Sequence, residues 1–197
     1  MPSLRMVDLS AESVVPRLRG RFGRPYLYVP RCESTQHLLP ESAAEGAAAV
    51  TDLQTAGRGR LGRRWIARPG TSILCSIVLR PNVEPARLPE LTPVAGEACA
   101  AAIAEVTGLQ PTIKFPNDVL IGGRKVAGIL AEAREGRVVL GIGINVNAQQ
   151  HEVPEAATSL SLEAGHGVDR AELLVSLLEQ LERHYDRWVA SARSSRP

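Results

Sequence analysis

Residues 112–144 read TIKFPNDVLIGGRKVAGILAEAREGRVVLGIGI. Three largely apolar runs stand out in this stretch, at 112–115, 126–133 and 137–144. The second run follows Gly122-Gly123 and the third follows Glu135-Gly136, and such dipeptides are typical of tight turns. Strands joined by tight turns lie side by side and run in opposite directions. The stretch therefore predicts three strands of a largely antiparallel sheet.

Further strands are expected before this stretch. Their apolar or small residues lie at 26–29, 48–52 and 72–79. Ser34 is placed to cap a helix that runs through Ala43, with a kink or restart at Pro40. Thr92-Pro93 is a typical start for a helix to about residue 106, which Gly108 can end.

The last part of the chain predicts a long helix against the core. Asp169 with Glu172 three residues later resembles a capping box at its start. Apolar residues then recur at helical spacing, at positions 173, 174, 177, 178, 181, 185 and 188. Because strands and helices do not alternate as βαβ units, the pattern predicts an α+β fold with a mixed, largely antiparallel sheet flanked by helices. We expect a short extension over 1–25, one domain over 26–190 and a polar tail over 191–197.

Composition narrows the classes of function. A formal net charge of +2 over 197 residues is too small for a general nucleic-acid binder, so basic chemistry must be local. The three cysteines, Cys32, Cys75 and Cys99, are odd in number and widely spaced, which argues against a disulfide framework and indicates reduced, mostly buried thiols. The sequence has no apolar run of the length that marks a membrane span, so we expect a cytoplasmic protein with no membrane partner.

Residues 57–62 read GRGRLG, which matches the GxGxxG pattern of dinucleotide-binding turns. Such a turn opens directly into a helix, whereas Arg63, Arg64 and Trp65 follow here, with Pro69-Gly70 soon after. The glycines let an anion approach the backbone closely, and each arginine can donate two hydrogen bonds to a phosphate. These features favour a loop that closes over a nucleotide. Taken alone, the segment is equally typical of a solvated basic turn, and contact with an RNA backbone is a further alternative.

Residues 114–118 read KFPND. Proline restricts the residue before it to extended backbone, which orients Lys114 and Phe115. The lysine suits phosphate and the aromatic ring suits a base, while Asn117 and Asp118 offer oxygen ligands of the kind Mg²⁺ takes beside substrate phosphates. By itself, Pro-Asn-Asp is ordinary turn chemistry.

Lys125 begins an apolar run to Leu130, in which Gly128 allows a ligand to approach closely. Residues 141–147, GIGINVN, predict a smooth strand that ends in two amides. The alternatives are a surface lysine at a hairpin turn and a buried strand followed by a turn.

Taken together, these segments resemble the biotin protein ligases. The resemblance rests on Ser34-Thr35-Gln36, on Gln54 with the glycine–arginine segment to Trp65, and on residues 114–118, 124–130 and 141–147, which occur in the family's order and approximate spacing. It covers about residues 26–188. As a set the segments are highly specific, and they imply the biotin/lipoate ligase fold, which is similar to that of class II aminoacyl-tRNA synthetases.

The resemblance also implies site residues. Those expected to bind biotin are Ser34, Thr35, Gln36, Gln54, Gly57, Arg58, Arg60, Lys125, Gly128 and Leu130. Those expected to bind ATP are Arg60, Arg63, Trp65, Lys114, Phe115, Asn117, Asp118 and Asn145, with Asp118 holding Mg²⁺. The residues expected to act on the developing charge are Lys125, Arg58 and Arg60. Gln36 and Phe115 depart from the family, which usually has asparagine and tryptophan there.

The implied activity has two steps, in which biotin and ATP form biotinyl-5'-AMP and the biotinyl group then passes to a lysine of a biotin carboxyl carrier domain. ATP is needed because a free carboxylate is a poor acyl donor and a carrier lysine with a pKa of about 10.4 is mostly protonated at neutral pH. The resemblance predicts no N-terminal DNA-binding domain, no DNA partner and no C-terminal β-barrel domain, and it leaves a homodimer open. The alternatives are a lipoate or octanoate ligase, a non-catalytic biotin or nucleotide sensor, and an RNA-binding module.

Overall fold

The computed structural model describes residues 8–134 and 136–194. Its core is a seven-stranded sheet with the order β1-β2-β3-β7-β6-β5-β4, in which only β1 and β2 pair in parallel. The strands are β1 (Tyr26–Cys32), β2 (Ala48–Gln54), β3 (Ser72–Leu79), β4 (Thr112–Lys114), β5 (Asp118–Ile121), β6 (Arg124–Arg134) and β7 (Arg137–Asn145). This arrangement confirms the predicted mixed, largely antiparallel sheet.

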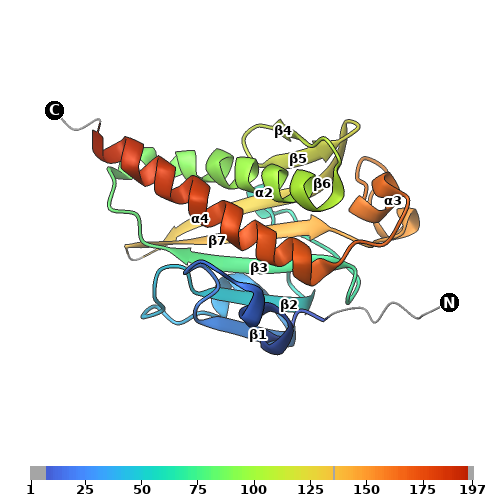
Figure 1. Cartoon of the computed structure of the whole chain (residues 1–197), viewed down its shortest axis with the longest axis horizontal. Coiled ribbons are helices and arrows are strands. Elements are labelled where there is room, and N and C mark those ends of the chain that lie inside the picture. The colour runs from blue at the N-terminus through green and yellow to red at the C-terminus, as the bar shows by residue number, and fades with distance from the viewer. Residues whose placement is uncertain (1–7, 135, 195–197) are drawn as a thin grey trace.

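Helices cover one face of the sheet, with α2 and α4 lying beside each other across it (Figure 1). The helices are α1 (Ala11–Val14), α2 (Leu91–Thr107), α3 (Leu160–Ala164) and α4 (Arg170–Ser194). Short 3-10 helices are η1 (Val15–Arg17), η2 (Thr35–His37), η3 (Arg60–Gly62), η4 (Pro85–Glu90) and η5 (Gln150–Glu152). All eight residues of β3 are buried, because β3 is central in the sheet and both of its faces are covered.

The closing helix forms as its pattern predicts. All seven apolar residues of the repeat are buried, from Leu173 to Trp188. The Asp169 carboxylate accepts hydrogen bonds from the backbone N–H of Ala171 at 2.8 Å and of Glu172 at 3.2 Å, so it caps the first turn. The helix continues to Ser194 with Ala192 buried, so it extends beyond the expected domain end at residue 190.

The predicted helix from Ser34 to Ala43 is wrong. Only η2 forms there, with the Ser34 hydroxyl accepting a hydrogen bond from the Gln36 N–H at 3.4 Å. Pro40 has no N–H to donate to a helical turn, and Leu39 and Ala43 instead pack in a small cluster with Val78. The chain therefore leaves the helical path within a few residues of Ser34.

Two other boundaries differ from expectation. Thr92 is not an N-cap, because α2 begins at Leu91 as a continuation of η4, and Pro93 is tolerated in the first turn, where its missing N–H has no partner in the helix. The strand β5 was not expected. It forms because residues 115–117 reverse the chain and let Asp118 pair with Lys114, whereas Pro-Asn-Asp indicates only a turn. Gly108 ends α2 in the left-handed conformation, as predicted.

The expected N-terminal extension belongs to the same core as the rest of the chain. Leu9, Val14, Leu18 and Phe22 are buried in the main hydrophobic cluster, and the Tyr26 hydroxyl donates to the Leu9 carbonyl at 2.7 Å. No structural boundary therefore separates residues 8–25 from β1. Within the described part of the chain, no helix combines the length and the apolar character that crossing a membrane would require.

Candidate functional site

The glycine–arginine segment folds back on itself beside the sheet. The Gly59 N–H donates to the Arg63 carbonyl at 2.7 Å, and the Trp65 N–H donates to the Gly57 carbonyl at 3.0 Å. The segment lies on the sheet face opposite the helices, because it meets Gly128 and Gly143 while their neighbours Ile129 and Ile142 face the helical core. It thus covers the face of β6 and β7 on which no helix packs.

Trp65 rests on a platform without side chains. Gly128 and Gly143 are register partners on β6 and β7. A Cβ atom at Gly143 would lie 2.6 Å from the Trp65 ring, and one at Gly128 would lie 2.9 Å from it. The two glycines therefore permit the half-buried indole to lie directly on the backbone. The Trp65 Nε1–H is buried without a hydrogen-bond partner among the described residues.

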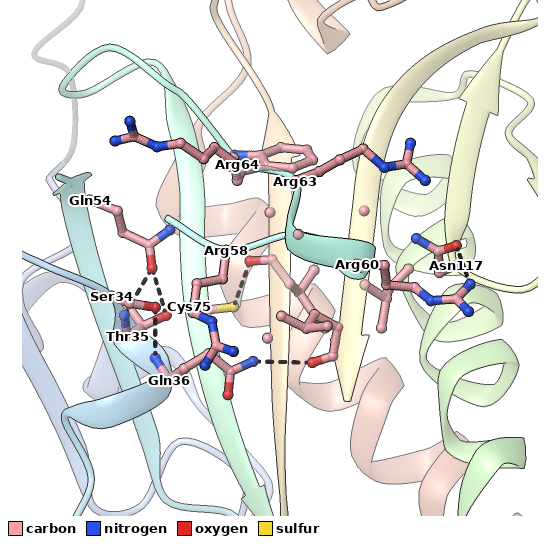
Figure 2. Close-up of a pocket in the computed structure, with 18 of the residues that line it drawn as sticks. Ser34, Thr35, Gln36, Gln54, Arg58, Arg60, Arg63, Arg64, Cys75 and Asn117 are labelled. Carbon is pink, nitrogen blue, oxygen red and sulfur yellow. Dashed lines mark hydrogen bonds between the residues drawn. The ribbon is translucent and has the colours of Figure 1, made fainter. Parts of the chain in front are cut away.

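A pocket lies between this segment, η2 and the middle of the sheet (Figure 2). Its cavity volume is about 110 Å³, below the roughly 300–1,000 Å³ of most ligand sites. The lining residues are Ser34, Thr35, Gln36, Gln54, Arg58, Gly59, Arg60, Arg63, Arg64, Trp65, Cys75, Asn117, Lys125, Gly128, Ile129, Leu130, Gly141, Ile142 and Gly143. The small volume shows that the loop and Trp65 fill much of the space above the sheet.

One part of the pocket is built from uncharged polar groups. The Gln54 Oε1 accepts hydrogen bonds from the Thr35 N–H at 2.8 Å and from its hydroxyl at 3.2 Å, which fixes the Gln54 carboxamide. The Gln36 Nε2 donates to the Leu130 carbonyl at 3.1 Å, while its Oε1 is buried without a partner among the described residues. A buried acceptor without a donor is costly, so this part of the pocket suits a ligand that brings N–H donors.

Another part is cationic. The Lys125 Nζ lies 2.6 Å from Asp118 Oδ1 and 5.5 Å from the centroid of the Trp65 ring. Arg60 donates to the Asn117 Oδ1 at 3.0 Å, and Asn117 donates to Asp118 Oδ1 at 3.0 Å. These contacts place the two cations at neighbouring points of one network, where they can meet a carboxylate or a phosphate.

The backbone of Lys125 is held from the other side by the segment at 156–158. Its N–H donates to the Ala156 carbonyl at 3.0 Å, and its carbonyl accepts from the Thr158 N–H at 2.9 Å. Asn145, which is buried, donates through Nδ2 to the Thr158 carbonyl at 3.1 Å. Asn145 therefore supports the segment that positions Lys125.

Of the residues expected to bind biotin, all but Gly57 line the pocket. Of those expected at ATP, Arg60, Arg63, Trp65 and Asn117 line it as well, and Asp118 touches it through Lys125. Lys114, Phe115 and Asn145 lie outside the lining, and Phe115 is 68% exposed. Lining residues outside the expected set are Gly59, Arg64, Cys75, Ile129, Gly141, Ile142 and Gly143.

Gly141 and Gly143 could have been found from the sequence, since the alternation of glycine with isoleucine in GIGIN indicates a smooth strand face. Cys75 carried none. Burial raises the pKa of its thiol to about 12, so it stays a neutral thiol at neutral pH and supplies no nucleophile.

Asp118 is the candidate ligand for a divalent cation. In the described ranges, no group of three or more histidine, cysteine or carboxylate side chains is arranged to hold a metal ion. Both contacts of the Asp118 carboxylate, from Lys125 and from Asn117, are made to Oδ1. One carboxylate fits Mg²⁺ only where substrate phosphates supply further ligands, which is a usual arrangement for this ion.

Several known proteins are similar to this chain in sequence and in fold. The family model described as Biotin/lipoate A/B protein ligase family matches residues 28–148. A Bacillus subtilis (strain 168) protein named bifunctional ligase/repressor BirA is 42% identical over 176 residues, which are 83% of this chain and 54% of that protein. A Mycobacterium tuberculosis protein named biotin--[acetyl-CoA-carboxylase] ligase is 39% identical over 149 residues, 73% of this chain and 56% of that protein.

Among solved structures, a biotin protein ligase from Aquifex aeolicus in complex with biotin and ATP superposes with a TM-score of 0.77 and 34% identity, covering 84% of this chain and 72% of that chain. The chain spans about half the length of the curated relatives it matches. Because some relatives are named ligase/repressor, the absence of a DNA partner stays a prediction.

Proposed function

Because the chain belongs to the biotin/lipoate A/B protein ligase family, we propose that it is an ATP-dependent biotin protein ligase. In the proposed reaction, a biotin carboxylate oxygen attacks the α-phosphorus of ATP, pyrophosphate leaves and biotinyl-5'-AMP forms. The amine of a lysine on a biotin carboxyl carrier domain then attacks the acyl carbon, and AMP leaves as the amide forms.

The proposal is carried by the division of the pocket into an uncharged polar part and a cationic part. Gln36 and Gln54 offer polar groups to the ring of biotin, whose ureido N–H groups are donors, and Leu130 lines the pocket as an apolar wall for the chain of biotin. Lys125 and Arg60 then meet the carboxylate and the phosphate. A molecule with a polar ring, an apolar tail and a terminal carboxylate matches this sequence of surfaces.

The cations have distinct proposed roles. Lys125 and Arg60 stabilise charge that grows on the phosphoryl oxygens, because donors that are already in place act most strongly where charge develops. Arg63 lines the pocket, and no ion pair or hydrogen bond engages its guanidinium among the described residues, which leaves it for the phosphates of ATP. When bound beside the phosphates, Mg²⁺ at Asp118 would neutralise charge on the leaving pyrophosphate.

The proposed compartment is the cytoplasm. Cys32, Cys75 and Cys99 are all free thiols, and two of them are buried. Free, unpaired cysteines are typical of a reducing compartment.

A pyrophosphate-release assay tests the proposed function. We expect pyrophosphate with biotin and ATP, and biotinylation when a biotin carboxyl carrier domain is added. Replacing biotin with lipoate tests the alternative within the family, and release with lipoate alone would assign the chain to that substrate. Binding of biotin and ATP without pyrophosphate would indicate a sensor.

A further inference from the structure

We propose that Glu132 is a positioning residue for biotin binding, acting by fixing the guanidinium of Arg58, and this inference rests on the proposed function. The Arg58 Nη2 lies 2.9 Å from Glu132 Oε1, and its Nη1 donates to Glu132 Oε2 at 3.1 Å. Two parallel contacts of this kind fix both the distance and the orientation of the guanidinium. Arg58 Nη1 also lies 3.4 Å from His37 Nε2 of η2.

The other arginines of the loop are held differently. Arg60 donates to the Asn117 carboxamide and Arg64 donates to the Thr55 carbonyl at 2.8 Å. Arg58 is thus the arginine of residues 57–65 that has a carboxylate partner in the described structure. Its charge is compensated by Glu132, so it serves as a wall of the pocket, whereas the charges of Arg60 and Arg63 remain for phosphate.

The position of Glu132 on β6 explains how it acts on the pocket. Glu132 lies two residues beyond Leu130, so both side chains project from the same face of the strand. Leu130 and Arg58 line the pocket, whereas Glu132 does not. The pair therefore ties the start of the loop to the strand that forms the pocket wall, and Glu132 affects the ligand only through Arg58.

This geometry predicts a coupled loss of affinity. Glu132→Gln keeps the shape of the side chain but removes its charge, and we expect biotin affinity measured by calorimetry to fall about two- to fivefold, the range of a half-exposed ion pair. In an Arg58→Met background, Glu132→Gln should cause no further loss. Glu182→Gln is the matched control, because Glu182 forms an ion pair of similar exposure with Arg21 at 2.8 Å but neither residue lines the pocket, and it should leave the affinity unchanged.

A second readout needs no ligand. The chain has two tryptophans, and Trp188 is buried at 7% exposure, so acrylamide quenching of fluorescence reports mainly on Trp65. Glu132→Gln should increase quenching, because the loop start that carries the Gly57 contact to Trp65 is no longer tied to β6. Unchanged quenching, or losses of affinity that add independently to those of Arg58→Met, would overturn the proposal. If the wild-type protein failed to bind biotin while Glu132→Gln still increased quenching, only the proposed function would be contradicted.

Discussion

Lys125 combines three features that suit it to the first half of the proposed reaction. Its backbone is held by residues 156–158, its ammonium is paired with Asp118, and the same ammonium lies over the Trp65 ring. We expect Lys125→Met to lower biotin-dependent pyrophosphate release by about 10²- to 10³-fold, the usual effect of losing one preorganised donor. Lys125→Arg should rescue part of the rate, because a guanidinium fork has a different reach from an ammonium.

The control for Lys125 is preformed biotinyl-adenylate, which bypasses the first step. Acyl transfer to a carrier domain should be less affected than adenylation. A mutant with normal pyrophosphate release, or a wild-type protein that carries a biotinyl group on Lys125, would contradict the assignment.

The sequence predicted pocket residues that belong to recognisable motifs. It missed residues whose proposed role depends on a contact between distant segments. Thr35, Gln54 and Lys125 belong to segments with a recognisable order, and all three line the pocket. Glu132 lies 74 residues from Arg58, and nothing in the local sequence indicates that the two side chains meet. Such pairs depend on the register between distant elements, which the linear pattern does not specify.

Among the elements, the loop over residues 55–65 is expected to change most when ligand binds. It carries four arginines, Leu61 is 87% exposed with φ of 57°, and the pocket beneath it is small. A non-glycine residue at positive φ is strained, and clustered cations repel one another until an anion neutralises them. We expect backbone amides of this loop to gain protection from hydrogen exchange with biotinyl-adenylate, and equal exchange at saturation would contradict this.

Helix α2 offers a test of packing at the element scale. Gly96 lies inside the helix, and a Cβ atom there would meet its nearest side-chain atom, Ile113 Cγ2, at an ordinary 3.7 Å. Because alanine restricts the unfolded chain and fits this space, Gly96→Ala should stabilise the protein by about 0.4–1 kcal/mol. The midpoint temperature of thermal unfolding should rise by about 1–4 °C. A lower midpoint would mean that α2 cannot accept the methyl group.

Element prediction succeeded where one local signal was strong. The buried run of β3 and the leucine repeat of α4 were both recognised, because hydrophobic periodicity and burial agree there. The segment after Ser34 failed, since a cap and two leucines favour a helix while Pro40 and packing against Val78 oppose it. The four residues of β5 were too short for a pattern, and only their pairing with β4 and β6 makes them a strand.

All three tyrosines have pKa values above that of a free tyrosine. Burial, with the Asp52 carboxylate, raises the pKa of Tyr28 to about 12, and burial also raises the pKa values of Tyr26 and Tyr185. Because the folded state keeps protons that the unfolded state loses near pH 10, this stabilisation is fully present below that pH and is lost as pH rises toward 12 and above. Absorbance at about 295 nm should show no phenolate step near pH 10 in native protein and a full step in urea.

The N-terminus of α4 is tied to the sheet by a nearly buried ion pair. Arg170 is 5% exposed and lies 2.6 Å from Asp52 Oδ1 on β2, and it donates to the Ser72 carbonyl of β3 at 3.2 Å. Tyr28 of β1 donates to the other Asp52 oxygen at 2.5 Å. One arginine thus connects the helix layer to three strands.

Arg170→Met should therefore destabilise the whole molecule rather than the pocket alone. It leaves the Asp52 carboxylate largely enclosed without its cation, at a cost of about 3 kcal/mol in the free energy of unfolding by urea, near the lower bound for broken buried pairs because Asp52 is partly exposed. Arg183→Met, on the exposed side of the same helix, should change stability by less than about 0.5 kcal/mol. The double variant Arg170→Met, Asp52→Leu should recover much of the lost stability, since neither charge is then left unpaired. If the single Arg170 variant lost no more stability than the Arg183 variant, α4 would be held by its leucine repeat alone, and the ion pair would be incidental to the fold.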